Sequence, residues 1–468
     1  MSRLPMFWHA RSSAAKIEQR LFRVLLQMIE FLRSQFSGLR VVFLILLKHR
    51  RLLFGANRLP PGKLLPLYER EQKNRRLLLE IMEKKGPIFK ARHEKQLMIC
   101  IVGLPHCHQF AQENSSKSHM ATVDLKSLFP HGFLRQMEGT THKRYRSILV
   151  RGLASDQIDR NKDVHLSIIE NALEKFRLGS ESAPDAATSY SEALLEIASG
   201  LLIQTFFGYA PGSEDYTWLL QRYQGLGKDN YHWNIGENQK NNFVEIRDHL
   251  MHKLETPSKI APQSILGRMA TLSSIDETSL GNLIYMVEMG RHDMRGLFRW
   301  LSKYVSENPK KLAGIRQEPS NFPPEKMTHT RAFVLETLRM DQIERLIRIA
   351  DVDLVFQGFT IPKDSYVRLC LWESHKDSTN FSDPFEFHAT RFFQASYSVK
   401  QFAPFGIDHH QCPLGRVAIH MGMLLVKTLA DHYEVVKVAD GPPARELNQW
   451  RPAANFSISL KPISPRSL

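Results

Sequence analysis

The sequence is poor in cysteine. It has only Cys100, Cys107, Cys370 and Cys412 in 468 residues, and their spacing does not indicate a disulfide framework. We therefore expect a reducing compartment, in which each cysteine is judged by its own surroundings.

The chain also lacks a long apolar run near its N-terminus. The most apolar stretch there, residues 41–47, holds seven residues between Arg40 and Lys48. A bilayer-spanning helix needs about 20 apolar residues, so this stretch is excluded as a membrane span. No dinucleotide-binding fingerprint follows a strand-like segment, which predicts that redox equivalents come from another protein.

Acidic residues are scarce at the start of the chain. The formal net charge is +15, and within residues 1–60 the basic side chains are opposed only by Glu18 and Glu30. Such a charge attracts acidic partners. Because the remaining body is only mildly basic and shows no zinc-finger or RNA-binding motif, we expect no nucleic-acid partner.

The first 55 residues form a predicted basic extension. Residues 17–36 place apolar side chains at helical spacing with arginines between them, as in a helix that lies on a membrane surface or packs on the protein body. Leu59-Pro60-Pro61-Gly62 reads as a hinge. We expect residues 1–55 to be an amphipathic extension with a possible peripheral membrane role, residues 56–468 to be one catalytic domain, and the protein to be cytoplasmic.

The residue pattern of the main domain is largely typical of helices. Residues 133–310 carry long amphipathic segments, whereas residues 351–370 are rich in β-branched residues and are broken by Gly358 and Pro362. A final helix is predicted over residues 413–432. The fold class is therefore mostly α with a minor β-sheet.

The segment 402–416 (FAPFGIDHHQCPLGR) carries the most chemistry. It places Cys412 just ahead of a predicted helix, where the helix dipole and free backbone N–H groups stabilise a thiolate. Such a sulfur is a good axial ligand for haem iron. Gly406 permits a tight turn beneath a flat porphyrin, and His410 and Arg416 suit the haem carboxylates. The pair His409-His410 fits a haem edge better than a separate metal site.

This segment, the earlier Glu336-Thr337-Leu338-Arg339 and the intervening FSDPFEFHATRF resemble the cytochrome P450 superfamily in order and spacing. The resemblance covers about residues 59–460 and implies a single haem-thiolate domain with heme b (iron protoporphyrin IX). Two departures stand in the cysteine loop: Asp408 and Leu414 occupy positions where the family commonly has Gly.

The resemblance also implies roles for particular residues. Cys412 is the expected iron ligand, and Glu336, Arg339 and Arg391 are expected to form a buried structural network. The remaining haem contacts expected from the resemblance are His142, Arg146, Arg348, His410 and Phe405.

Residues 281–305 resemble the helix that crosses the distal face of the haem. The family usually has an acid followed by Thr here, but this chain has His292 and Asp293. Oxygen activation needs proton delivery, which Asp293 and His292 are predicted to supply. Arg291 is a candidate anchor for a substrate carboxylate. In the alternative reading, Arg291 and His292 face outward and only Gly290 and Asp293 lie near the haem.

The predicted function is a haem-thiolate monooxygenase that oxidises a small, mostly apolar molecule. Electrons are expected from an acidic ferredoxin, flavodoxin or reductase that meets basic residues such as Lys143, Arg144 and Arg416. One alternative is a haem-thiolate enzyme that uses peroxide or catalyses a rearrangement, dehydration or coupling. The other is a haem-binding sensor or scaffold without turnover.

Overall fold

The computed structural model describes most of the chain from residue 38 to residue 463. The described ranges are 38–53, 58–122, 124–153, 160–180, 186–226, 236–256, 260–319, 326–341, 346–446 and 449–463.

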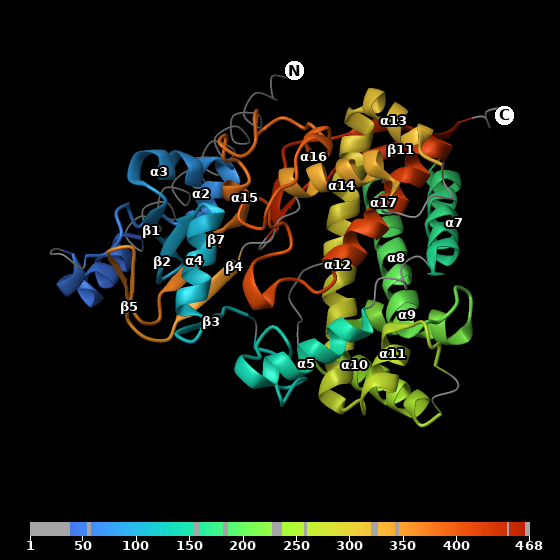
Figure 1. Cartoon of the computed structure of the whole chain (residues 1–468), viewed down its shortest axis with the longest axis horizontal. Coiled ribbons are helices and arrows are strands. Elements are labelled where there is room, and N and C mark those ends of the chain that lie inside the picture. Colours follow the sequence, from blue (N-terminus) through green and yellow to red (C-terminus); the bar gives the residue numbers. More distant parts are fainter. Residues whose placement is uncertain are drawn as a thin grey trace, which may run out of the picture.

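Helices dominate one half of the molecule, and a small sheet forms the other half (Figure 1). The α-helices are α2 (Leu67–Lys73), α3 (Leu77–Lys85), α4 (Leu104–Asn114), α5 (Gly139–Gly152), α7 (Lys162–Ser180), α8 (Ala186–Phe207), α9 (Glu214–Leu226), α10 (Glu237–Leu254), α11 (Ile265–Leu272), α12 (Glu277–Glu307), α13 (Leu312–Gln317), α14 (Thr328–Met340), α15 (Leu371–Ser374), α16 (Arg391–Gln394) and α17 (Gly415–His432). Short 3-10 turns are η1 (Arg50–Leu52), η3 (Pro309–Lys311) and η5 (Asp408–His410).

The main sheet has five strands in the order β1-β2-β7-β4-β3, and only β2 and β7 run parallel. Its strands are β1 (Ile88–His93), β2 (Gln96–Val102), β3 (Ser118–Met120), β4 (Leu346–Ala350) and β7 (Tyr366–Cys370). Three two-stranded pairs complete the strands: β5 (Leu354–Phe356) with β6 (Phe359–Ile361), β8 (Tyr433–Ala439) with β11 (Ser457–Pro462), and β9 (Ala444–Glu446) with β10 (Gln449–Arg451). The mostly α fold class with a minor sheet is confirmed.

Helix α12 is the longest helix described, with 31 residues, and it passes through the helical half (Figure 1). It begins where the Asp276 side chain accepts a hydrogen bond from the Ser279 backbone N–H at 2.7 Å, which caps the first turn. It ends before Pro309, which cannot continue the helix. Helix α8 contributes many buried apolar residues and packs along α12, and α17 contacts α12 as well. These three helices form the centre of the largest core cluster.

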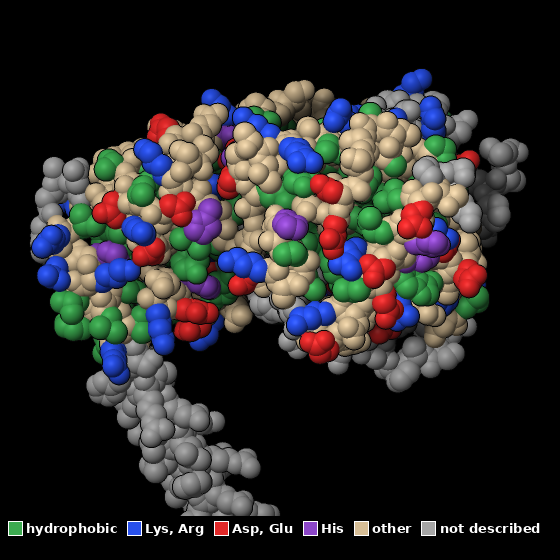
Figure 2. All heavy atoms as spheres, turned by 90° about the horizontal axis from the view of Figure 1, so that it is seen from below, with side chains coloured by type: hydrophobic (Ala, Val, Ile, Leu, Met, Phe, Trp, Pro, Cys, Tyr) green, Lys and Arg blue, Asp and Glu red, His purple; other side chains and the backbone are tan. Residues whose placement is uncertain are grey.

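Residues 38–53 pack on the sheet half. Residues 38–48 are helical, and Ile45 of this helix is buried in the core cluster that contains Leu59 and Phe356. The opposite face exposes Leu39, Phe43, Leu44 and Leu47 next to basic residues. Figure 2 shows hydrophobic and basic side chains together at this end of the molecule.

The predicted amphipathic helix 17–36 and the predicted boundary at 55/56 lie outside the described residues. Membrane contact therefore stays a prediction. In the part of the chain that the structure describes, no helix combines the length and apolar character needed to cross a bilayer.

Candidate functional site

A cavity of about 230 Å³ lies between the cysteine loop and α12. Phe405, Gly406 and Cys412 form one wall, and Gly290 and Asp293 of α12 form the opposite wall. Most of the remaining lining is apolar and includes Leu134, Leu202, Tyr285, Met286, Met289, Leu297 and Val417. The structure therefore brings the predicted iron ligand and the predicted distal helix to opposite sides of one hollow.

The backbone of the cysteine loop is held in a tight curve. The Cys412 N–H donates to the Phe405 carbonyl at 2.9 Å. Gly406 has φ +89° and Asp408 has φ +59°, so both occupy the left-handed region that favours Gly and tolerates Asp. Cys412 is exposed toward the cavity, two residues before the Leu414 N-cap of α17. The loop thus presents the sulfur at the positive end of a helix.

Gly415 is needed for close packing in this loop. A Cβ atom at Gly415 would lie 2.8 Å from the Phe405 ring, closer than real side chains approach. Gly415, the residue after Leu414, therefore allows the Phe405 ring to pack against the start of α17.

Imidazole and guanidinium groups gather at one edge of the cavity. His142 and Arg146 come from α5 and His410 comes from η5, and all three line the cavity. Arg146 donates to the Gln411 carbonyl at 2.7 Å. Arg348 of β4 does not line it; its guanidinium donates to the Ser118 carbonyl at 2.6 Å.

The donor chemistry of this edge fits the carboxylates of a haem. His142 is buried, and its Nε2 atom has no hydrogen-bond partner within the described part of the chain. Burial, together with the nearby His410 and His409, lowers the pKa of His142 to about 4. A buried group left without a partner is costly, and a bound carboxylate would satisfy it.

The predicted structural network is present as three side chains in contact. The Arg339 Nε donates to Glu336 at 2.8 Å, and the Arg391 Nε donates to the same carboxylate at 3.1 Å. Glu336 and Arg339 are fully buried, and Arg391 is almost so. The backbone N–H of His388 also donates to Glu336 at 2.8 Å. The network ties α14 to the segment that leads toward the cysteine loop.

On α12, Asp293 lies on the cavity side and has a defined partner. The Gln449 side-chain amide on β10 donates to Asp293 Oδ1 at 3.0 Å, and both residues line the cavity. The hairpin that carries Gln449 is fixed to α12, because Trp300 Nε1 donates to the Trp450 carbonyl at 2.9 Å. Sequence reasoning missed Gln449, since nothing in the sequence relates a C-terminal strand to this turn of α12.

Arg291 and His292 lie elsewhere. The Arg291 guanidinium is 2% exposed and makes two bonds to Glu288, at 2.8 and 2.9 Å, and one to the Tyr223 carbonyl at 2.9 Å. His292 Nε2 lies 3.2 Å from Glu288. Both side chains are outside the cavity lining described above.

This placement differs from the expected roles of Arg291 in substrate binding and of His292 in proton transfer. Both roles required side chains that face the haem. It agrees with the alternative in that, of residues 290–293, only Gly290 and Asp293 line the cavity, but Arg291 and His292 are buried and do not face outward. The spacing does hold one signal: Glu288 lies three residues before Arg291 and four before His292, on the same face of the helix.

Taken together, a cysteine ahead of a helix, a long helix across the cavity and a buried Glu-Arg-Arg network define the architecture of a haem-thiolate protein. The Cytochrome P450 family model matches residues 303–463. Cytochrome P450 76T24 of Catharanthus roseus is 22% identical over 431 residues, covering 78% of this chain and 84% of that protein. The chain belongs to the cytochrome P450 superfamily.

Other similar proteins match shorter parts or the fold alone. Abscisic acid 8'-hydroxylase 1 of Arabidopsis thaliana is 27% identical over 182 residues, which cover 36% of this chain and only 39% of that protein. The solved structure of retinoic acid-bound cyanobacterial CYP120A1 superimposes with a TM-score of 0.68 at 18% identity, covering 86% of this chain and 99% of that one. A structure of cytochrome P450 OleT with arachidonic acid gives 0.68 at 15% identity, covering 88% and 100%.

Replacing Glu336 with Ala should destabilise the fold strongly. Two buried guanidinium groups would lose their shared carboxylate, and breaking a buried ion pair costs about 3–5 kcal/mol. Urea unfolding followed by circular dichroism measures the change. The control is Glu196→Gln, which removes the carboxylate of an exposed pair with Lys175 and should cost about 0–1 kcal/mol. Equal losses for the two variants would contradict a structural role for the network.

Proposed function

We propose that this protein is a haem-thiolate monooxygenase that oxidises a small, mostly apolar organic molecule with dioxygen and electrons from a separate partner. The observation that carries the proposal is the cavity with Cys412 on one wall and Asp293 on the other, lined between them by apolar side chains. The names of the relatives support it, since several that align with this chain are hydroxylases. Heme b, when bound, supplies the iron chemistry that activates oxygen.

In this proposal the residues at the cavity have distinct roles in haem binding and substrate orientation. Cys412 would ligate the iron, and its place before α17 would favour the anionic form of the sulfur. His142, Arg146 and His410, which line the cavity, would hold the haem carboxylates, and Phe405 would contact the haem; Arg348, expected to do the same, does not line the cavity. The apolar lining excludes water and orients the substrate.

Asp293 holds the proton that oxygen activation consumes. Its carboxylate is at the cavity wall and accepts a hydrogen bond from the Gln449 side-chain amide, which fixes the position of Oδ1. A carboxylate in this position can take a proton from water and return it within the cavity. Gln449 acts through Asp293 and is a positioning residue.

Cys412→Ala should abolish thiolate ligation. The reduced, carbon monoxide-bound absorption spectrum measures this directly, because it reports the axial ligand. Cys107→Ala is the matched control: burial raises the pKa of Cys107 to about 12, so its thiol stays protonated and it lies away from the cavity. An unchanged spectrum for Cys412→Ala would refute the proposed function.

Asp293→Asn should uncouple electron consumption from product formation. Loss of a positioned proton donor costs about 10²–10⁴-fold in proton transfer, so we expect at least about tenfold less product per electron and more released hydrogen peroxide. Gln449→Ala should give a smaller change in the same direction. Gln109→Ala, on the exposed surface of α4, is the control. Normal coupling in Asp293→Asn would remove this residue from the mechanism.

The electron donor is proposed to be an acidic protein that docks near α5. Lys143, Arg144 and Arg416 are exposed, and the ion-pair contact of Arg144 with Asp276 is long, at 3.7 Å. Exposed charges of this kind steer association more than they add affinity.

Reversing Lys143 and Arg144 together to Glu should slow reduction by an acidic ferredoxin and weaken the dependence of its rate on salt. Stopped-flow reduction at two ionic strengths measures both. Lys175→Glu on α7 is the control for a charge change on another helix. Reduction at the wild-type rate in the double variant would place the donor elsewhere.

One observation supports a second candidate function. The turn of α12 from Met289 to Asp293 contains no Ser or Thr, the residues that usually carry the hydroxyl in this family. A haem-thiolate enzyme that uses peroxide, or that rearranges, dehydrates or couples its substrate, needs no such hydroxyl. Product formed with hydrogen peroxide but not with dioxygen and reductant would favour it. A haem-binding sensor or scaffold would show the thiolate spectrum and no product with either oxidant.

A further inference from the structure

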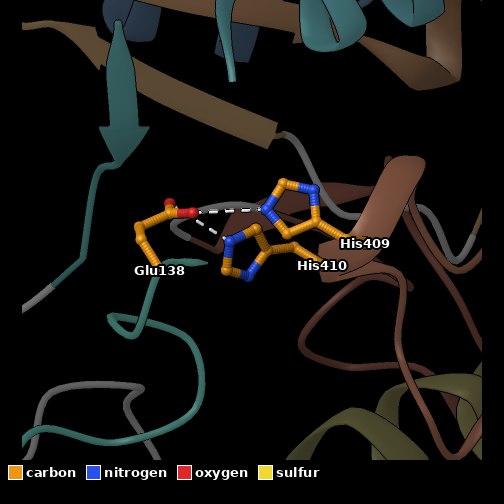
Figure 3. Close-up of side chains that lie close together, drawn as sticks. All are labelled: Glu138, His409 and His410. Carbon is orange, nitrogen blue, oxygen red and sulfur yellow. Dashed lines mark hydrogen bonds and ion pairs between the residues drawn. The ribbon is translucent and has the colours of Figure 1, made fainter. Parts of the chain in front are cut away.

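Glu138, His409 and His410 converge at the outer edge of the cavity, although 271 residues separate the first two in the chain (Figure 3). His409 Nε2 lies 3.2 Å from Glu138 Oε2, and His410 Nε2 lies 3.2 Å from Glu138 Oε1. The three ligand atoms all lie within 4.8 Å of one another. Two imidazoles and a carboxylate are the ligand types that zinc prefers when one position is left to water.

The second ring nitrogen of His409, Nδ1, contacts the carboxylate of Asp408. Asp408 Oδ1 lies 2.5 Å from His409 Nδ1, so Nε2 is the nitrogen left to face Glu138. A carboxylate on the far nitrogen of a histidine fixes its ring and raises its basicity, as it does around protein-bound metals. Asp408 holds this position with a left-handed backbone, at φ +59°. The residue that departs from the family's common Gly is thus the one that orients His409.

The distances suit a small tetrahedral ion. With bonds of about 2.0–2.1 Å, neighbouring ligand atoms of zinc lie about 3.4 Å apart, and both histidine-to-carboxylate distances here are 3.2 Å. Glu138 and His409 are partly exposed, so a cation has access from solvent. Arg348 opposes a cation, with its guanidinium 3.4 Å from Glu138, but the Asp408 carboxylate adds a second negative charge.

We propose that Glu138, His409 and His410 bind one divalent transition metal ion of the zinc class, with water as a further ligand and Asp408 as the orienting partner. This site goes beyond the proposed oxidation chemistry. The ion would link the start of α5 to the loop that carries Cys412. His410 belongs to both sites, because its Nε2 faces Glu138 while its side chain also lines the cavity.

The test uses the haem-loaded protein after treatment with a chelator. Equilibrium dialysis against micromolar zinc, with metal analysis, should find one zinc per chain in the wild type and none at this site in His409→Ala. Asp408→Asn should keep the stoichiometry and weaken the affinity about 10–100-fold. Zinc should also raise the thermal midpoint of the wild type and not of His409→Ala, because a ligand stabilises the state that binds it.

His432→Ala is the matched control, since His432 is exposed and lies 3.8 Å from a glutamate on α7. It should bind zinc as the wild type does. Equal zinc binding by the wild type and His409→Ala, or no binding by the wild type, would overturn the proposal. The carbon monoxide spectrum of His409→Ala should be that of the wild type, so failure of the zinc site is distinguishable from failure of the haem-thiolate assignment.

Discussion

The shared carboxylate of Glu336 holds together parts of the chain that would otherwise be independent. Two guanidinium groups and a backbone N–H converge on it in a fully buried setting. Arg339 extends the network further, because it also donates to the carbonyls of His375 and Pro384. An irregular segment that lacks regular secondary structure thereby gains a fixed position. Because the cysteine loop follows this segment in the chain, the network also helps to fix where the loop lies.

Helix α12 has two faces with different chemistry. One face carries a buried cluster in which Glu288 compensates Arg291 and contacts His292. This cluster also ties α12 to α9, because Arg291 donates a hydrogen bond to the Tyr223 carbonyl. The other face presents Gly290 and Asp293 to the cavity. An added Cβ at Gly290 would lie 3.1 Å from Leu202, so close packing of α8 also constrains this turn.

The sequence was sufficient to predict the family, the fold class and the loop that carries Cys412, because each depends on residues that are near one another in the chain or on a strong local pattern. It was insufficient where side-chain direction decides the outcome. Arg291, His292 and Asp293 are consecutive, and only the rotation of α12 determines which one faces the cavity. Contacts between segments that are distant in the sequence could not be predicted either, because residues such as Gln449 and Asp293 come together only in the folded chain.

The anchoring of the β9–β10 hairpin has a consequence for the breadth of ligands that the protein can accommodate. Trp300 binds the Trp450 carbonyl and Arg299 binds the Ala453 carbonyl, so this wall is fastened to the C-terminal half of α12. Adaptation to ligand shape then falls to the remaining walls, where methionines recur: Met120, Met286, Met289 and Met294. Unbranched, polarisable thioethers can re-pack around different outlines at little cost. The cavity therefore combines one rigid wall, formed by the β9–β10 hairpin, with methionine side chains that can change conformation.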